Sequence, residues 1–160
     1  MTGADDQTAA VAALSAADEI RNLLGRYTEA IDAADFAGVG ALFAHGRLAL
    51  VRDDPGSDIV GADAVAAFYA ATVRVHADGT PRTHHLTTNT IIEFDGVDAA
   101  TARSAYTVFM ATDGYELQPM ICGRYEDRFH VVDSAWWFAS RHMTVSLVGD
   151  LSRHLTIDLP

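Results

Sequence analysis

Three short turn signals divide the second half of the chain into four strand-like segments. The turns are Asp95-Gly96, Asp113-Gly114 and Asp133-Ser134, and such residue pairs are typical of tight connections. The segments that they separate are residues 82–94, 100–111, 116–132 and 136–148. The first of them is rich in β-branched residues, which favour strands. Strands joined by such short turns pair antiparallel, so the pattern predicts a four-stranded meander.

The first half of the chain has helical periodicity instead. Apolar residues recur every three or four positions from Ile20 to Ile31, which predicts an amphipathic helix over about residues 15–34. Ser15 and Asp18 resemble a capping box at its start. Asp35 is expected to cap a short second helix, and Gly61 to open a third helix. Short strands are expected at residues 47–52 and 57–60.

Helices followed by a meander are typical of the α+β class rather than of a parallel α/β sheet. We therefore predict a cone-shaped, curved antiparallel sheet with three N-terminal helices and a cavity between the layers. The domain is expected to span residues 15–160, preceded by a flexible N-terminus at residues 1–14. Apolar sheet surface left outside the cone favours a homo-oligomer, most simply a dimer.

The composition excludes several functions. The formal net charge is -11, and an acidic surface repels nucleic acid. All 11 basic residues are arginine, so this chain has no lysine for Schiff-base chemistry. The single cysteine, Cys122, is expected to be a buried small hydrophobe, and no motif indicates a metal or another cofactor. Without a signal peptide or an apolar run of about 20 residues, we expect a cytoplasmic protein with no membrane partner.

A few polar residues within the predicted elements are candidates for acid/base chemistry. Tyr27 lies on the apolar stripe of the first helix, either as a core residue or as a donor to a substrate carbonyl. Asp32 is rotated by about 140° from Tyr27, so simple helix geometry does not place both in one pocket. Asp32 is either a solvated carboxylate near the helix end or, if the helix ends at the mouth of the cavity, a second pocket residue. His84 and His85 are neighbours at a strand start, so only one of them can face the cavity.

Arg141 lies in the last predicted strand, in an apolar setting. A buried arginine needs a carboxylate partner, which the fold itself or a substrate carboxylate or thioester can supply. The remaining candidates are core-type residues that can equally line a pocket; they are Phe43, Phe68, Tyr106, Met120 and Trp137.

The order of elements resembles the SnoaL-like branch of the nuclear-transport-factor-2-like (NTF2-like) superfamily. The motifs that carry the resemblance are IRNLLGRY at residues 20–27, IDAAD at 31–35, GADAVAAFY at 61–69, HLTTN at 85–89, WFASR at 137–141 and VGDLSRH at 148–154. The superfamily contains scytalone dehydratase, bile-acid dehydratase, steroid isomerase and polyketide cyclases, together with non-catalytic proteins. Fold alone does not choose among these functions.

The resemblance implies a cofactor-independent acid/base enzyme, a dehydratase, isomerase or cyclase that acts on a small hydrophobic carbonyl compound such as a polyketide or steroid. It implies catalytic roles for Tyr27, Asp32 and His85, and it selects His85 over His84 because His85 and Asn89 match a His-x-x-x-Asn pattern. Asn89 is expected on the same strand face as His85. The alternative is a non-catalytic small-molecule-binding protein or an accessory subunit of the same fold.

Overall fold

The computed structural model describes residues 3–157. The chain begins with α1 (Gly3–Asp32) and α2 (Phe36–Ala41), followed by the short strands β1 (Arg47–Ala49) and β2 (Ile59–Val60) and by α3 (Ala62–Thr72). A single 3₁₀ turn, Pro55–Ser57, lies between the two short strands. The four long strands are β3 (Thr83–Asp95), β4 (Ala99–Thr112), β5 (Tyr115–Val132) and β6 (Ala135–Val148).

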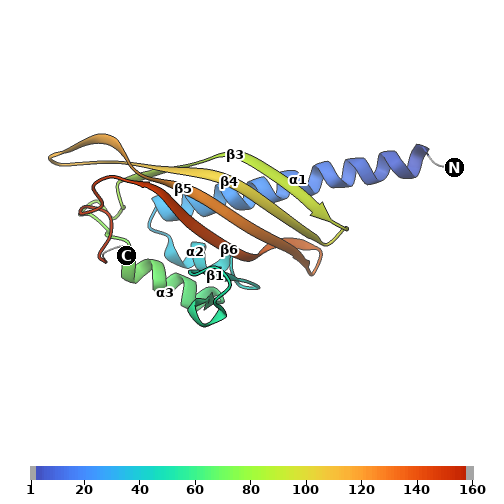
Figure 1. The fold of residues 1–160 in the computed structure, drawn as a ribbon, viewed down its shortest axis with the longest axis horizontal. Coiled ribbons are helices and arrows are strands. Elements are labelled where there is room, and N and C mark those ends of the chain that lie inside the picture. Colours follow the sequence, from blue (N-terminus) through green and yellow to red (C-terminus); the bar gives the residue numbers. More distant parts are fainter. Residues whose placement is uncertain (1–2, 158–160) are drawn as a thin grey trace.

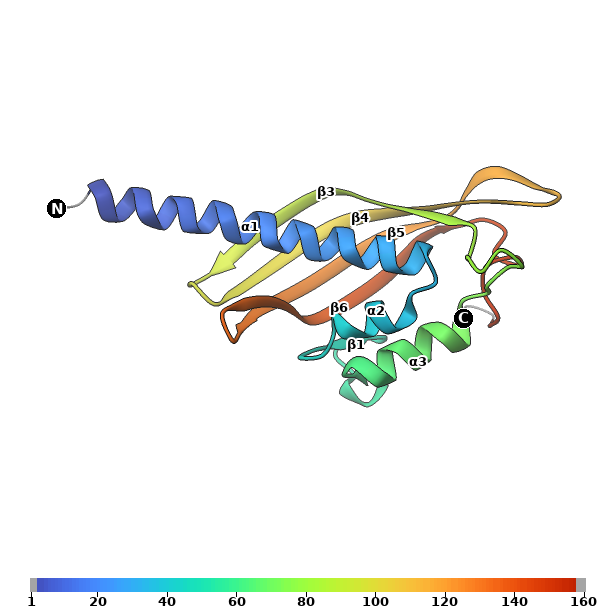
Figure 2. The same ribbon diagram turned by 180° about the vertical axis from the view of Figure 1, so that it is seen from behind.

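The six strands form one curved sheet in the order β2-β1-β6-β5-β4-β3. All neighbours pair antiparallel except β1 and β6, which are parallel. Three helices precede the meander, and α1 lies across one face of the sheet while its first turns extend beyond the sheet (Figures 1 and 2). The predicted α+β fold is therefore confirmed.

The core lies between the helices and the inner face of the sheet. In β4, alternate residues from Ala100 to Met110 are buried, because successive side chains of a strand point to opposite faces of the sheet and only one face is covered by helices. The apolar stripe of α1 packs against this face, and each large apolar side chain buried there stabilises the fold by about 1.5–3 kcal/mol. Aromatic rings, including Tyr27, Phe43 and Phe138, meet at the centre, where the sequence predicted a cavity.

Two predicted boundaries differ from the structure by three residues or more. The first helix begins at Gly3, well before Ser15, because the alanine-rich residues before Ser15 favour helix. Asp18 therefore caps nothing and instead forms an exposed ion pair with Arg21 at 3.0 Å. The flexibility predicted for residues 1–14 stays a prediction, and residues 1–2 lie outside the described part of the chain.

The second difference concerns the first predicted strand. β1 ends at Ala49 rather than at residue 52, since Asp53 takes a positive φ of 59° and the chain then turns through Pro55–Ser57. Within residues 3–157, no helix combines the length and the apolarity that crossing a bilayer requires.

Candidate active site

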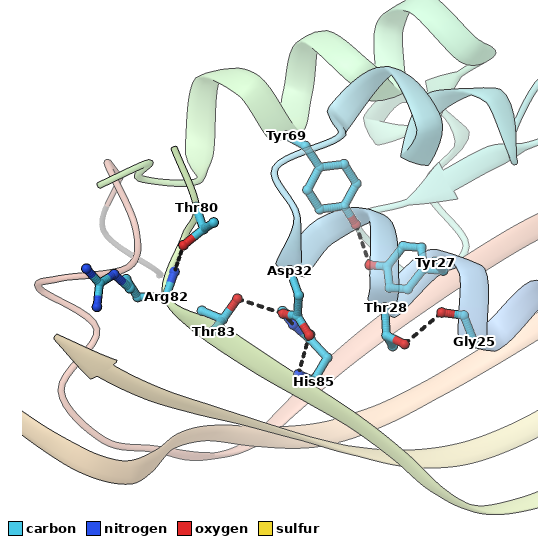
Figure 3. Close-up of polar contacts among 9 residues, drawn as sticks. All are labelled: Gly25, Tyr27, Thr28, Asp32, Tyr69, Thr80, Arg82, Thr83 and His85. Carbon is cyan, nitrogen blue, oxygen red and sulfur yellow. Dashed lines mark hydrogen bonds and ion pairs between the residues drawn. The ribbon is translucent and has the colours of Figure 1, made fainter. Parts of the chain in front are cut away.

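Asp32 joins the end of α1 to the start of β3 (Figure 3). Its Oδ1 accepts a hydrogen bond from the Thr83 hydroxyl at 2.7 Å and one from His85 Nδ1 at 2.6 Å. Its Oδ2 accepts a hydrogen bond from the backbone N–H of His85 at 2.9 Å. The carboxylate therefore fixes both the backbone and the ring of His85.

The position of Asp32 at the C-terminal end of a helix is electrostatically unfavourable for a carboxylate, because the helix dipole is negative there. The hydrogen-bond donors of Thr83 and His85 on β3 offset this cost. Burial alone would raise the pKa of the Asp32 carboxyl. The net shift is nevertheless downward, because the carboxylate is stabilised by the hydrogen bond and charge of His85, by the His85 backbone N–H and by the Thr83 hydroxyl. Asp32 is therefore ionised at neutral pH.

The orientation of the His85 ring follows from this contact. A carboxylate only accepts hydrogen bonds, so Nδ1 carries the proton and Nε2 carries a free lone pair in the neutral ring. No hydrogen bond within residues 3–157 engages Nε2. The side chain is 8% exposed, whereas neighbouring His84 is exposed on the opposite face of β3. The structure therefore directs His85, and not His84, inward.

His85 lines a groove of about 560 Å³ between α1 and β3. Leu24, Gly25 and Thr28 contribute one wall from a single face of α1, while Thr87 and Thr90 lie on the strand side. The groove has room beside the helix, because a methyl group added at Gly25 would meet no atom within 4 Å. A small ligand in this groove would contact His85.

Tyr27 points elsewhere. Its side chain is 1% exposed, and its hydroxyl is 2.6 Å from the hydroxyl of Tyr69, with Met143 Sδ at 3.8 Å (Figure 3). The rotation between Tyr27 and Asp32 expected from helix geometry is thus present: Tyr27 faces the core, and Asp32 faces β3. None of the described hydrogen bonds joins Tyr27 to the Asp32–His85 pair.

Arg141 has the internal ion pair that was one of its two predicted alternatives. It is 0% exposed, and its Nε and Nη2 each donate to the Asp127 carboxylate at 2.8 Å. The guanidinium carbon lies 4.1 Å from the centre of the Tyr27 ring and 3.9 Å from that of Tyr125. This enclosure separates Arg141 from any ligand in the α1–β3 groove.

The other predicted lining residues do not form one pocket wall. Phe43, Tyr106 and Met120 are core residues, and Phe68 packs against the core while partly buried. Trp137 pairs with His130 on the sheet face opposite to Phe138, and its ring contacts His45 at 4.8 Å. The expectation that Trp137 lines an inner pocket is therefore wrong.

Asn89 does not share the face of His85, so this expectation is also wrong. The register between β3 and β4 shifts between Thr88 and Ile91, and Asn89 has a positive φ of 54° and is exposed. An irregularity of this kind interrupts the alternation of side chains along a strand.

No pattern in the sequence predicts a role for Thr83, Tyr69 or His154. Thr83 binds Asp32, and Tyr69 binds Tyr27. His154 is buried, and this burial lowers the pKa of its ring to about 4, while its backbone carbonyl accepts a hydrogen bond from the N–H of Arg74 at 2.7 Å. No spacing rule identifies these residues, because each depends on a contact between segments distant in sequence.

Among residues 3–157, no group of three or more His, Cys, Asp or Glu side chains is placed to bind a metal ion. Cys122 is half-buried and has a free thiol.

Comparison with known proteins gives the family and the fold. The SnoaL-like domain family matches residues 12–142. A variant of Rv3472, a protein of unknown function from Mycobacterium tuberculosis, is 28% identical, with 92% of this chain and 78% of that chain covered and a TM-score of 0.66. An NTF2-like protein with a cystatin-like fold from Novosphingobium aromaticivorans has a TM-score of 0.74 at 23% identity, with 91% of each chain covered.

A provisionally assigned scytalone dehydratase from Novosphingobium aromaticivorans has a TM-score of 0.69 at 20% identity, with 88% of this chain and 91% of that chain covered. At such low identity the likeness shows the fold alone. No sequence among curated proteins matches this chain. The family match covers most of the chain, including the Asp32–His85 pair, and this protein therefore belongs to the SnoaL-like domain family.

Proposed function

We propose that this protein is an acid/base enzyme, a dehydratase or isomerase that removes a proton next to the carbonyl group of a small, mostly apolar molecule. One observation carries the proposal. The 2.6 Å contact between His85 Nδ1 and Asp32 leaves Nε2 without a hydrogen-bond partner among the described residues, and His85 lines an open groove. A fixed imidazole with a free nitrogen is the group best suited to exchange protons near neutral pH.

In a dehydration, His85 Nε2 takes the proton from the carbon next to the carbonyl group, and the electron pair of that bond forms an enolate. Asp32 stabilises the resulting imidazolium, as a buried carboxylate does for other catalytic histidines. The enolate then expels hydroxide from the β-carbon, and the imidazolium returns its proton to the leaving group as water. The products are an unsaturated ketone and water, and the enzyme is regenerated.

The size of the groove supports a small-molecule substrate. Its volume of about 560 Å³ lies within the range of ligand sites. Its helical wall is mixed, with Leu24 and Gly25 between the polar residues Arg21 and Thr28, and the threonines of β3 supply further hydroxyl groups. The fold of a scytalone dehydratase is among those similar to this chain, which agrees with this reaction class.

The role of Tyr27 as donor to the substrate carbonyl stays a proposal. It requires the Tyr27 hydroxyl to exchange Tyr69 for a substrate oxygen. Assistance from Arg141 would likewise require opening of its ion pair with Asp127.

A non-catalytic binding protein is the second candidate, and the filled core favours it. Aromatic rings and the Arg141–Asp127 pair occupy the centre of the cone, and the α1–β3 groove is one of several surface grooves on the described residues. We also expect a homodimer. Leu86, Thr107, Cys122 and Leu147 are neighbours across β3, β4, β5 and β6, and the two leucines are exposed, so a second copy of the chain could cover this apolar surface. Cytoplasmic location stays a prediction.

The proposal is tested by the proton-transfer step that dehydratases and isomerases share. Exchange of the α-protons of 1-tetralone for deuterium is followed by NMR, and dehydration of 3-hydroxy-1-tetralone to 1-naphthol is followed by absorbance. We expect wild-type protein to catalyse at least the exchange, His85→Gln to lose about 100-fold or more, and His84→Gln to match wild type. Equal rates for wild type and His85→Gln, across these and other cyclic ketones, would support the binding-only candidate.

A further inference from the structure

One face of α1 forms the helical wall of the groove that His85 lines. Arg21, Gly25 and Thr28 lie on this wall, and Asp32 follows Thr28 after four further positions. At about 100° per residue, these four positions point within about 60° of one another. The row therefore runs along the helix from Arg21 to the carboxylate that holds His85.

The two walls of the groove run in opposite directions. Asp32, at the end of α1, contacts Thr83 and His85 at the start of β3, and α1 extends back along that strand toward its far end (Figures 1 and 2). Arg21 is about 16 Å from Asp32 along the helix axis, and Thr90 is about 16 Å from His85 along the strand. Arg21 and Thr90 both line the groove, so they lie at the end opposite the Asp32–His85 pair.

The space between the two ends of the groove is open. A Cβ added at Gly25, which lies between Arg21 and Thr28, would meet no atom within 4 Å. The Thr28 hydroxyl is turned toward its own helix, because it donates to the carbonyl oxygen of Gly25 at 2.8 Å. The groove of about 560 Å³ can therefore hold one molecule that reaches from His85 to Arg21.

The far end of the groove is positively charged. Among the residues that the structure describes, Arg21 is the one permanently charged residue of the lining, and no acidic residue lines the groove. Only Nη1 of the guanidinium is engaged by a described hydrogen bond, in an ion pair with Asp18 at 3.0 Å. Both side chains are exposed, and an exposed pair of this kind contributes little. Arg21 therefore keeps hydrogen-bond donors for a ligand.

A carboxylate is the ligand group that best fits this end of the groove. Two parallel hydrogen bonds can join a carboxylate to a guanidinium, and the opposite charges strengthen both. A neutral polar group gains less, because it carries no charge. A dianion such as a phosphate ester would be repelled more strongly by Asp18 and by a chain of net charge -11.

We propose that Arg21 binds a carboxylate of the substrate at the end of the groove opposite His85. The inference rests on the proposed function, which places the reacting carbonyl group at His85. It narrows the substrate to a carbonyl compound with an apolar middle part and a carboxylate at the far end of the molecule. It also gives Arg21 the anion-binding role that was one of the two alternatives for Arg141, which is enclosed with Asp127.

The test compares 8-oxo-8-phenyloctanoate with its primary amide. The two ketones have the same length, and only the first carries a charge. Dissociation constants are measured by calorimetric titration for wild type, Arg21→Met, Arg26→Met and Asp18→Asn. Methionine keeps an unbranched apolar side chain without the charge. Arg26 is the matched control, because it is also an exposed arginine of α1 but lines a different groove.

We expect wild type to bind the carboxylate about threefold or more tightly than the amide. Arg21→Met should abolish this preference and leave amide binding unchanged, whereas Arg26→Met should retain it. Asp18→Asn should increase the preference, because it removes the acid that competes for Nη1. A preference that persists in Arg21→Met, or that Arg26→Met also abolishes, would overturn the inference. A wild type that binds both ligands equally, or neither, would overturn it too.

The proposed function is scored separately, by deuterium exchange of 1-tetralone, which has no carboxylate. Exchange that depends on His85, without a preference that depends on Arg21, would keep the proposed function and overturn the carboxylate site. An Arg21-dependent preference without exchange would keep the carboxylate site and overturn the proposed catalysis.

Discussion

The carboxylate of Asp32 accepts two hydrogen bonds from one residue, His85: one from Nδ1 at 2.6 Å and one from the backbone N–H at 2.9 Å. The backbone contact fixes the position of His85 at the start of β3, and the ring contact fixes its tautomer. Thr83 adds a third donor at 2.7 Å. A side chain held in this way is preorganised, so little reorganisation is needed when the free nitrogen accepts a proton.

The substitution Asp32→Asn tests this arrangement. The amide has nearly the same shape but carries no charge, and its nitrogen cannot accept the bonds that the second carboxylate oxygen accepts. We expect turnover of 3-hydroxy-1-tetralone to fall by about 100-fold or more, because the imidazolium loses its counter-charge. The low-field proton NMR signal expected for Nδ1–H in wild type would also disappear. Unchanged turnover in folded Asp32→Asn protein would contradict the assigned role.

Gly25 offers a test of the groove that leaves the polar residues intact. It lies on an exposed face of α1, and a Cβ added there meets no atom within 4 Å. Replacing a helical glycine with alanine stabilises a helix by about 0.5–1 kcal/mol, so Gly25→Ala should raise the melting temperature. Gly25→Leu should retain much of that gain.

The two Gly25 variants should differ in ligand binding. The leucine side chain would fill part of the groove beside His85 and weaken binding of 1-tetralone, whereas Gly25→Ala would bind it nearly as wild type does. Calorimetric titration of the three proteins provides the comparison. Normal binding by Gly25→Leu would show that the substrate enters elsewhere.

Much of the architecture was readable from short signals. Asp95-Gly96, Asp113-Gly114 and Asp133-Ser134 lie at or between the ends of successive strands, as their turn propensities predict. Asp35 caps α2 by accepting the N–H of Gly38 at 2.8 Å. These features depend on neighbouring residues only, and local preferences identify them.

The site was less accessible to sequence reasoning, because its geometry depends on contacts between distant segments. Arg141 lies directly opposite Asp127 because of the register between β5 and β6, and this register shifts between Arg128 and Phe129. Asn89 does not lie on the same face of β3 as His85, because the strand is irregular after Thr88. His154 is buried because the last segment pairs with residues around Val73. The pairing of Asp32 with His85 itself was implied by the family resemblance, not by spacing.

Variants of the buried pair Tyr27–Tyr69 can distinguish a structural role of Tyr27 from a catalytic one. The hydroxyls of Tyr27 and Tyr69 are 2.6 Å apart within the core. Because each satisfies the other, Tyr27→Phe and Tyr69→Phe should each destabilise the fold by about 1 kcal/mol, and the double variant by less than the sum. Chemical denaturation measures all three. Loss of turnover in Tyr27→Phe, with turnover retained in Tyr69→Phe, would support the donor role inferred from the resemblance.

The Arg141–Asp127 pair should contribute to folding and not to turnover in the groove. Asp127→Ala would leave a buried guanidinium without its carboxylate, which costs about 3–5 kcal/mol. The double variant Arg141→Met with Asp127→Ala should recover a large part of that loss, because no unpaired charge remains. Denaturant titration of the single and double variants tests the coupling. Loss of turnover in a double variant as stable as wild type would instead give Arg141 a place in substrate binding.

The burial of His154 predicts how stability depends on pH. Its pKa is lowered from 6.5 to about 4 in the folded protein, mainly by burial and then by His85 and His76, with Asp32 acting in the opposite direction. Between these values the unfolded chain binds a proton that the folded chain does not. Stability is therefore lost as the pH falls through this window, by about 3 kcal/mol when the shift is fully expressed.

The variant His154→Gln removes this proton uptake and should flatten the loss of stability between pH 6.5 and about 4. His84→Gln, at an exposed position of β3, is the matched control and should lose stability on acidification as wild type does. Denaturant titrations at several pH values give the free energy of unfolding for each protein. The carboxylates titrate in all three proteins, so the difference between the curves isolates His154. Parallel curves for wild type and His154→Gln would show that His154 is protonated as readily in the folded chain as in the unfolded one, which contradicts its burial as a neutral ring.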